Sequence, residues 1–332
     1  MIQIASLSRE EREELFLNTA HKIGMPPAIV EKDFWVCYML DYLFHRCEWK
    51  GKMVFKGGTS LSKAYHLIER FSEDIDLILD WRLLGYRIEE PWEPRSNTQQ
   101  DKFSESSERK TIALLEESLI PMLQRDVSAE IEETARVFLE NKSEPTVDFA
   151  YPQIFTDSSI LQVIRLEIGA LASWSPSQDA VITSFAAEQY PEIFTHPDTI
   201  IRTAVPERTF WEKVTILHRE ANRVSGRFPD RYSRHYYDLY QMATSTVKDQ
   251  AFQELYLLKA VIAFKMKFYR CPWAKYEEAI PGTIKLIPQE QYFSALQEDY
   301  SKMKNMIYGE VPSFDELLSS VRLLEAEINS LK

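Results

Sequence analysis

Three cysteines and nine glycines in 332 residues leave this chain poor in both residue types, and it has no long hydrophobic run. An odd number of cysteines without metal-ligand spacing gives neither a disulfide framework nor a zinc site, which favours a reducing cytosol. Apolar stretches fall short of the roughly 18 residues of a membrane helix, and the N-terminus lacks the basic start and apolar core of a signal peptide. We therefore expect a soluble, cytoplasmic protein with no membrane partner.

Basic residues are also in the minority. Against 51 aspartates and glutamates there are 39 lysines and arginines, so the formal net charge is −12. This balance argues against a general nucleic-acid coat protein, although it leaves room for a local basic groove. Hydrophobic residues make up 45% of the chain, as in a globular protein with a proper core, and the length suits two lobes or one elaborated α/β core.

The most informative stretch runs from Met53 to Leu79. Val54-Phe55 is typical of the end of a buried strand, and residues 57–60 (Gly-Gly-Thr-Ser) predict a tight polar turn. Residues 61–68 have the apolar spacing of a helix that packs back onto a sheet, and residues 74–79 form a second strand. A strand, a polar turn, a helix and a strand thus follow one another within 27 residues.

Asp74 and Asp76 lie on one face of that second strand, because side chains alternate along a strand. Two adjacent carboxylates repel each other unless a cation lies between them, and hard oxygen ligands suit Mg2+ or Mn2+. The preceding turn offers backbone N–H groups that glycine lets an anion approach closely. The candidate phosphate ligands are Gly57, Gly58, Thr59 and Ser60. Together these features equip a protein for phosphoryl or nucleotidyl transfer, whereas a lone Gly-Gly-Thr or a lone Asp-x-Asp is more often structural.

The middle of the chain reads as β-rich, and both ends read as helical. Ser8 with Glu11 forms a capping box at the first helix, and Glu31-Lys32-Asp33 is interpreted as the charged start of a packing helix. Helices are expected at 8–23, 28–48, 103–125, 248–268, 288–306 and 313–330, and strands at 146–151, 160–168, 180–187 and 198–204.

A third acid on a neighbouring strand would complete a metal cluster. Glu167 is one candidate, and Asp148 competes with it. An ion pair of Glu167 with Arg165 on the surface is the structural alternative.

Two later runs predict helices with polar faces. Residues 205–218 place Pro206 in a first turn, with Lys213 on the opposite side from much of the apolar stripe. Residues 228–240 carry a polar stripe at i, i+3, i+4 and i+7: Arg231, Arg234, His235 and Asp238. An exposed lysine and a surface salt-bridge ladder are the structural alternatives. Residues 264–270 are basic and aromatic, which suits either RNA contact or a helix end with snorkelling lysines.

In order along the chain, these runs resemble the motifs of the AbiEii/AbiGii toxin family of DNA polymerase β-like nucleotidyltransferases. The resemblance is carried by residues 57–60 with Arg70-Phe71-Ser72-Glu73-Asp74-Ile75-Asp76-Leu77, by residues 205–218 and by residues 228–240. Residues 31–36 also resemble the helix that precedes the first motif in that family, which is the alternative to a charged helix start. It implies an α+β fold, with a nucleotidyltransferase-like mixed sheet, flanking helices and a mostly helical C-terminal lobe. The expected domains are residues 1–204, the core with a helical insertion, and residues 205–332, the helical lobe.

The same resemblance assigns roles to residues. It implies that Asp74 and Asp76 hold the metal, with Glu167 at the position of the third acid. It implies that Lys213 reaches the nucleotide phosphates and that Asp238 either acts as a base or orients that lysine. Arg70 and the 57–60 turn join the nucleotide-binding set. Arg234-His235 stands where Lys-Asp is commoner in the family.

The function implied is that of a Mg2+- or Mn2+-dependent toxin, which transfers a nucleoside monophosphate from an NTP to an RNA acceptor such as tRNA, or to a protein hydroxyl. A cognate antitoxin is implied by kinship. The alternatives are a catalytically silent nucleotide-binding module and a phosphoryl-transferring relative.

Overall fold

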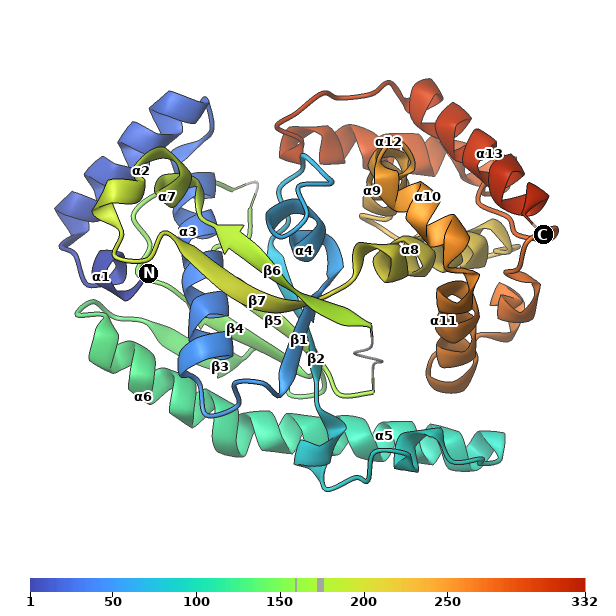
Figure 1. Cartoon of the computed structure of the whole chain (residues 1–332), viewed down its shortest axis with the longest axis horizontal. Helices are drawn as coiled ribbons and strands as arrows, with labels where there is room; N and C mark the ends of the chain where they lie inside the picture. Colours follow the sequence, from blue (N-terminus) through green and yellow to red (C-terminus); the bar gives the residue numbers. More distant parts are fainter. Residues whose placement is uncertain (159, 172–175, 332) are drawn as a thin grey trace. The chain divides into compact units, whose positions relative to one another are not determined.

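The computed structural model describes residues 1–158, 160–171 and 176–331 (Figure 1). The chain forms two compact units, each with its own contacts. The first unit comprises residues 1–64 and 73–203, and the second comprises residues 65–72 and 204–332. Residues 65–72 therefore pack with the C-terminal part of the chain, although they precede the strand that carries the aspartate pair.

A seven-stranded mixed sheet forms the centre of the first unit, in the order β3-β4-β5-β2-β1-β7-β6. Its strands are β1 (Met53–Lys56), β2 (Asp74–Leu79), β3 (Arg136–Leu139), β4 (Thr146–Ala150), β5 (Ile164–Gly169), β6 (Ser177–Thr183) and β7 (Asp198–Ala204). Strand β2 pairs antiparallel with β1 and parallel with β5, so it lies inside the sheet. The predicted α+β class with a mixed sheet is confirmed.

One face of the sheet is apolar and the other is polar around β2. Ile75 and Leu77 of β2 lie opposite Leu166 and Ile168 of β5, and all four are buried. Helix α3 (Pro27–Asp41) contacts β5, and its Trp35 packs against Phe149 of β4, next to β5 in the sheet. The alternation expected for β2 therefore holds, with its aspartates on the face that the apolar core does not occupy.

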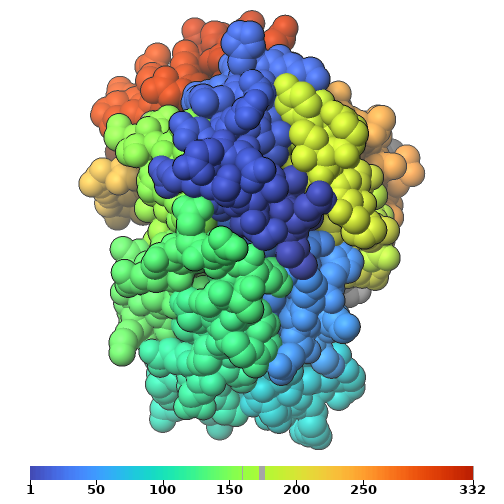
Figure 2. Space-filling view, turned by 90° about the vertical axis from the view of Figure 1, so that its left-hand side faces the viewer, coloured from blue at the N-terminus to red at the C-terminus, as the bar shows by residue number. Residues whose placement is uncertain are grey.

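Helices surround this sheet within the first unit. They are α1 (Ile2–Ala5), α2 (Arg9–Ile23), α3, the π-helix η1 (Tyr42–Arg46), α4 (Gly57–Lys63), α5 (Asn97–Leu114), the π-helix η4 (Leu115–Leu119), α6 (Ile120–Glu130) and α7 (Phe185–Gln189), with short 3-10 turns at η2 (Trp81–Leu84), η3 (Glu90–Trp92) and η5 (Pro191–Ile193). The predicted capping box of Ser8 and Glu11 is present. Figure 2 shows the N-terminal residues in dark blue beside the yellow segment that contains α7, where Lys22 donates to the Gln189 carbonyl.

Several predicted boundaries were wrong. The 57–60 stretch is not a turn before a helix, because α4 itself begins at Gly57 and ends at Lys63. The helix expected at 28–48 loses its α-geometry at Tyr42, where η1 begins. The strand expected from residue 160 begins only at Ile164.

The charged run at the start of α3 is not solvated, which corrects its interpretation as an ordinary helix start. Glu31, Lys32 and Asp33 are all buried. Glu31 accepts from the backbone N–H groups of residues 154 and 155, and Lys32 donates to Glu73, just before β2. Asp33 pairs with Lys63 of α4 at 2.8 Å. Buried charges are costly unless each is paired, so this network ties α3 to the segments that flank the aspartate pair.

The second unit is mostly helical, as expected for the C-terminal part. It contains α8 (Pro206–Ala221), α9 (Ser233–Ala243), α10 (Thr246–Gln253), α11 (Leu255–Phe268), α12 (Phe293–Met303) and α13 (Phe314–Ser330), with 3-10 turns η6 (Pro272–Ala274), η7 (Tyr276–Glu278), η8 (Glu290–Tyr292) and η9 (Lys304–Met306). The 65–72 segment joins it through backbone bonds, such as Phe71 N–H to the Met306 carbonyl at 2.7 Å. Within the described residues, no helix combines the length and apolar character needed to cross a membrane.

Candidate active site

The aspartate pair lies on the polar face of β2 and is half-buried. Asp76 stands opposite Lys56 of β1 and opposite Glu167 of β5, and Asp74 stands opposite Arg165. Side chains at aligned positions of neighbouring strands project from the same face of a sheet. The two predicted metal ligands and the predicted third acid therefore share one face, beside two basic side chains.

Asp76 lies directly against Gly57, the first residue of α4. Gly57 has φ +81°, and a Cβ built on it would lie 1.8 Å from Oδ2 of Asp76. Only glycine adopts this backbone conformation without strain, and only glycine leaves room for the carboxylate. Gly57 therefore makes room for the Asp76 side chain, and its predicted contact with a phosphate stays a prediction.

The hydroxyl groups of the next two residues hold this junction together. Thr59 Oγ1 donates to the backbone carbonyl of Asp74, and Ser60 Oγ donates to the Gly57 carbonyl at 2.8 Å. Thr59 and Ser60 are also buried. Their hydroxyl protons position β2 and α4, so these residues would meet a phosphate through backbone N–H groups.

The two candidates for the third acid have different surroundings. Asp148 is buried and forms a two-pronged ion pair with Arg165, with both N–O distances at 3.0 Å. Its hydrogen bonds raise the pKa of Arg165. Glu167 is exposed and in register with Asp76. Asp148 is thus committed to Arg165, whereas Glu167 is the acid in register with Asp76; which of the two is the third acid stays a prediction.

The donor set fits a hard divalent cation. Mg2+ commonly binds to one or two protein carboxylates and completes its shell with water and substrate phosphates. Asp74 and Asp76 provide two such carboxylates on one strand face, held in place by Gly57 and Thr59. Among the residues that the structure describes, no three His, Cys, Asp or Glu side chains are grouped as a metal site. The fit thus rests on the aspartate pair, and Glu167 as a ligand stays a prediction.

A second group of predicted residues comes together inside the second unit. Asp238 of α9 is fully buried and accepts two hydrogen bonds from Arg70, at 2.6 and 2.9 Å. Its Oδ2 also accepts from Lys213 Nζ of α8 at 2.7 Å. Arg70, Lys213 and Asp238 come from three separated stretches of the chain. Asp238 is thus hydrogen-bonded to both Arg70 and Lys213, as expected of a residue that orients the lysine.

The charges of this cluster shift the pKa values of its members. Burial opposes ionisation of Asp238, but Arg70 and Lys213 outweigh it and hold the Asp238 pKa below its usual 3.8. Burial lowers the pKa of Lys213, while Asp238 opposes that shift. A carboxylate with a depressed pKa is a poor general base, so this geometry favours an orienting role for Asp238.

His235 is the fourth member of the cluster. Its Nδ1 lies 3.1 Å from Lys213 Nζ. Burial and then the charge of Lys213 lower the His235 pKa well below 6.5, so the ring is neutral and accepts from the lysine at Nδ1. Arg231 does not belong to the predicted stripe, because it has φ +61° and lies before α9. Asp299 instead accepts from the backbone N–H of Arg231 and of Ser233 at the start of that helix.

Arg70 pairs with Asp238 inside the second unit. Its guanidinium donates two hydrogen bonds to the Asp238 carboxylate and thereby positions it. A direct contact of Arg70 with the nucleotide stays a prediction. Sequence reasoning also gave no role to Glu73, which accepts from Lys32 at 3.2 Å and from the Leu161 N–H at 2.7 Å. Its only signal in the sequence was its place beside Asp74.

The sheet with a carboxylate pair on one strand, followed by a helical part with a buried lysine, defines an α+β nucleotidyltransferase-type protein. The sequence model described as "Nucleotidyl transferase AbiEii toxin, Type IV TA system" matches residues 41–320. The chain belongs to this family of nucleotidyltransferase toxins, and the predicted kinship is confirmed. The family implies an NTP substrate and a cognate antitoxin.

A solved structure supports the fold. The chain is similar to MenT4, a nucleotidyltransferase toxin from Mycobacterium tuberculosis H37Rv, with a TM-score of 0.55 and 15% sequence identity. The match covers 96% of this chain and 90% of MenT4. At this identity the similarity establishes the fold alone. No curated protein sequence matches the chain.

Proposed function

We propose that this nucleotidyltransferase moves a nucleoside monophosphate from a magnesium-bound NTP to a hydroxyl group of an RNA acceptor. The acceptor hydroxyl loses its proton to solvent as its oxygen attacks the α-phosphorus, the bond to the bridging oxygen of the β-phosphate breaks, and pyrophosphate leaves. The observation that supports the proposal most is the seating of Asp76 against Gly57, with Asp74 on the same strand face.

We assign the metal and phosphate ligands of the first unit from their surroundings. Asp74 and Asp76 would hold the divalent cation, with Glu167 beside them. When bound, the cation supplies charge neutralisation to the phosphates and orients them. The backbone N–H groups of Gly57, Gly58, Thr59 and Ser60 are assigned to the phosphates.

Lys213 is assigned to the triphosphate. A lysine ammonium is a compact charge that can follow the phosphates through transfer. Asp238 and the neutral His235 fix its position, at 2.7 and 3.1 Å from Nζ. Asp238 is then a positioning residue, and Arg70 supports it.

The test uses two parallel reactions with total RNA and Mg2+, one with α-32P-labelled and one with γ-32P-labelled NTPs. We expect the α-label to enter RNA and the γ-label to appear in pyrophosphate. Asp76→Asn, which keeps the side-chain shape, should abolish the transfer. Asp179→Asn, an exposed carboxylate on β6 of the same sheet, is the matched control and should leave it intact.

Other outcomes separate the alternatives. Entry of the γ-label into RNA would make the protein a phosphoryl transferase. Entry of the α-label into the protein fraction would overturn the RNA acceptor. Saturable NTP binding without any transfer would support a silent nucleotide-binding module.

A further inference from the structure

One segment of the second unit has a charge opposite to that of the whole chain. From Leu255 to Tyr276 there are five lysines and arginines and no aspartate or glutamate, in a protein of net charge −12. The segment comprises α11 and the turn η6 that follows it. Local basic surfaces on acidic proteins are signatures of a polyanionic partner.

The exposed face of α11 has a defined line of side chains. Lys259, Ala263, Met266 and Arg270 follow one another at i, i+4, i+7 and i+11, and all four positions are exposed. Such spacing places side chains along one side of a helix and its immediate extension. The other side of α11 packs on α8, so this line is the solvent side.

Exposed aromatic rings lie at the end of this line. Tyr269 is 58% exposed and Trp273 is 36% exposed. The guanidinium groups of Arg219 and Arg223 lie over the Trp273 ring, 5.2 and 4.7 Å from its centroid. The Tyr269 ring lies beside Phe264, with centroids 5.5 Å apart, and is otherwise exposed. Trp273 beside two arginines and the exposed Tyr269 ring thus provide surfaces on which bases can stack.

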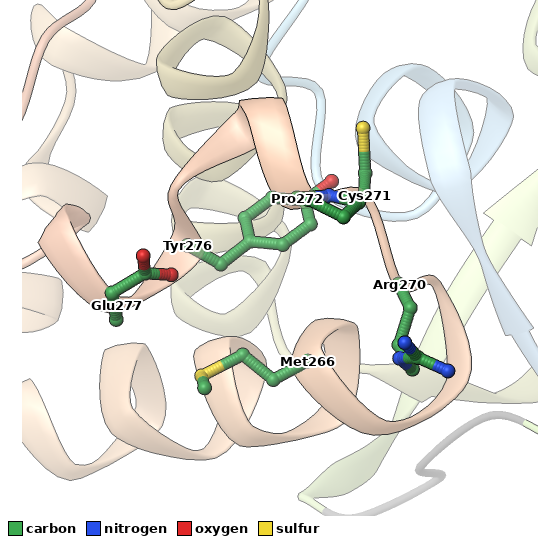
Figure 3. A pocket seen from close by; sticks show the side chains of 6 residues that line it. All are labelled: Met266, Arg270, Cys271, Pro272, Tyr276 and Glu277. Atoms are coloured by element: carbon green, nitrogen blue, oxygen red, sulfur yellow. The ribbon is translucent and has the colours of Figure 1, made fainter. Parts of the chain in front are cut away.

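A cavity opens at the same place. It has a volume of about 140 Å³ and is lined by Met266, Arg270, Cys271, Pro272, Tyr276 and Glu277. Figure 3 shows Arg270 and Glu277 on opposite sides, with Tyr276 and Met266 between them. A cavity needs roughly 10–15 Å³ of this volume to hold one water molecule, so the cavity has room for a group of several atoms. Its apolar walls with a charged group at each side suit a flat heterocycle.

We propose that α11 and η6 form a docking surface for an unpaired stretch of RNA, one base of which enters the cavity between Arg270 and Glu277. This rests on the proposed function, since it locates a contact surface for the acceptor RNA. The lysines along α11 contact the phosphates, and Tyr269 or Trp273 stacks on neighbouring bases. An unpaired stretch is required because the major groove of an A-form duplex is too narrow for side chains to read, whereas unstacked bases can be splayed onto a protein surface.

The cavity also predicts a base preference. The Glu277 carboxylate only accepts hydrogen bonds, so it selects a base with an amino group, such as cytosine or adenine. Uracil presents no amino group. We expect the surface to prefer oligo-C and oligo-A over oligo-U.

The first test measures binding of fluorescein-labelled RNA of about 12 nucleotides, within the usual site sizes, by anisotropy at several salt concentrations without NTP. Each lost phosphate contact lowers the slope of log K against log salt by about 0.7 for single strands. Lys259→Gln with Lys267→Gln should therefore lower the slope by about 1.4. The control Lys302→Gln with Lys304→Gln removes two exposed charges from the same unit and should leave it unchanged. Equal salt slopes for the unmodified protein, the α11 double variant and the control double variant would refute the proposal that α11 contacts RNA phosphates.

The second test addresses stacking and base choice. At least one of Tyr269→Ala and Trp273→Ala should weaken binding about 5- to 150-fold, the range for one stacked base. Glu277→Gln should reduce the preference for oligo-C over oligo-U. If Glu277→Gln keeps the preference for oligo-C over oligo-U, the cavity does not select the base. If Tyr269→Ala and Trp273→Ala both bind RNA with unchanged affinity, neither ring stacks on a base.

Failure of this proposal can be told apart from failure of the proposed function. Asp76→Asn should bind oligo-C as tightly as the unmodified protein while transferring nothing. The Lys259→Gln, Lys267→Gln protein should bind Mg2+–ATP normally but label RNA poorly. If the unmodified protein transfers the α-label to RNA while these lysine variants label RNA normally, the docking surface is wrong and the enzyme assignment stands. If oligo-C binds as described but no NTP label is transferred, the docking surface stands and the enzyme proposal fails.

Discussion

Replacing Asp238 with asparagine should destabilise the second unit strongly. The change keeps the shape of the side chain but removes the charge between Arg70 and Lys213, both of which are buried. The amide also turns one acceptor into a donor that faces another donor. Breaking a buried ion pair by removing one partner costs about 3–5 kcal/mol. The melting temperature of this unit should fall by about 10–20 °C, as measured by scanning calorimetry.

An exposed pair of the same unit supplies the control. Asp230 pairs with Arg227 at 2.7 Å, and both side chains are largely exposed. Exposed pairs contribute at most about 1 kcal/mol, so Asp230→Asn should hardly change the melting temperature. A fall of less than about 3 °C for Asp238→Asn would refute the buried cluster as a source of stability.

The pH dependence of the same variant tests the sign of the pKa shift. The Asp238 pKa is depressed below 3.8, so the unfolded chain binds this proton more readily than the folded protein. The stability from Asp238 is thus fully present above pH 3.8 and is lost as the pH falls toward the depressed pKa. The difference between the unmodified protein and Asp238→Asn should be constant from about pH 5 to 8 and shrink in more acidic buffers. A difference that grows on acidification would contradict the assignment.

Three further predictions concern the first unit. Gly57→Ala should lower nucleotidyl transfer at least about 100-fold in single-turnover assays, because the new Cβ displaces the Asp76 carboxylate; a normal rate would contradict the close approach. Glu167→Gln should lower the transfer rate without changing the melting temperature. Asp148→Asn should lower the melting temperature, because it breaks the buried pair with Arg165. The reverse pattern would make Asp148 the third acid and Glu167 the structural residue. Burial raises the pKa of Glu31 to about 7, so the folded protein holds this proton where the unfolded chain has lost it. Relative to Glu31→Gln, the unmodified protein should lose up to about 3 kcal/mol of stability between pH 5 and 8 in urea titrations, and a gain would contradict the shift.

Most strands and the shared face of the aspartate pair could be predicted because they depend on local pattern, whereas the mixed sheet was implied by the resemblance to the toxin family. Alternation along 74–79 fixes which side chains share a face, whatever the rest of the fold does. The capping box at Ser8 and Glu11 is equally local, since its partners are three residues apart. Boundaries were less secure: the glycines at 57 and 58 suggested a turn, whereas the structure uses them as the first residues of α4.

The buried charges could not be read from the sequence. Charged residues at a helix start are usually solvated, and only the distant partners of Glu31, Lys32 and Asp33 make their burial tolerable. The pairing of Arg70 with Asp238 joins residues 168 positions apart, which no periodicity reveals. Arg231 lies outside the predicted polar stripe because it precedes α9, where Asp299 of α12 accepts hydrogen bonds from the backbone N–H groups of Arg231 and Ser233.

The most direct test of the central claim is a double-mutant cycle between Asp76→Glu, which keeps a carboxylate and so a measurable rate, and Lys213→Met, read out as the single-turnover rate of α-label transfer to RNA. If both side chains act on one nucleotide, the double variant should be little slower than the slower single variant, because groups that act as a unit are strongly non-additive. A rate loss equal to the product of the two single losses would show that they act independently, and would contradict the account.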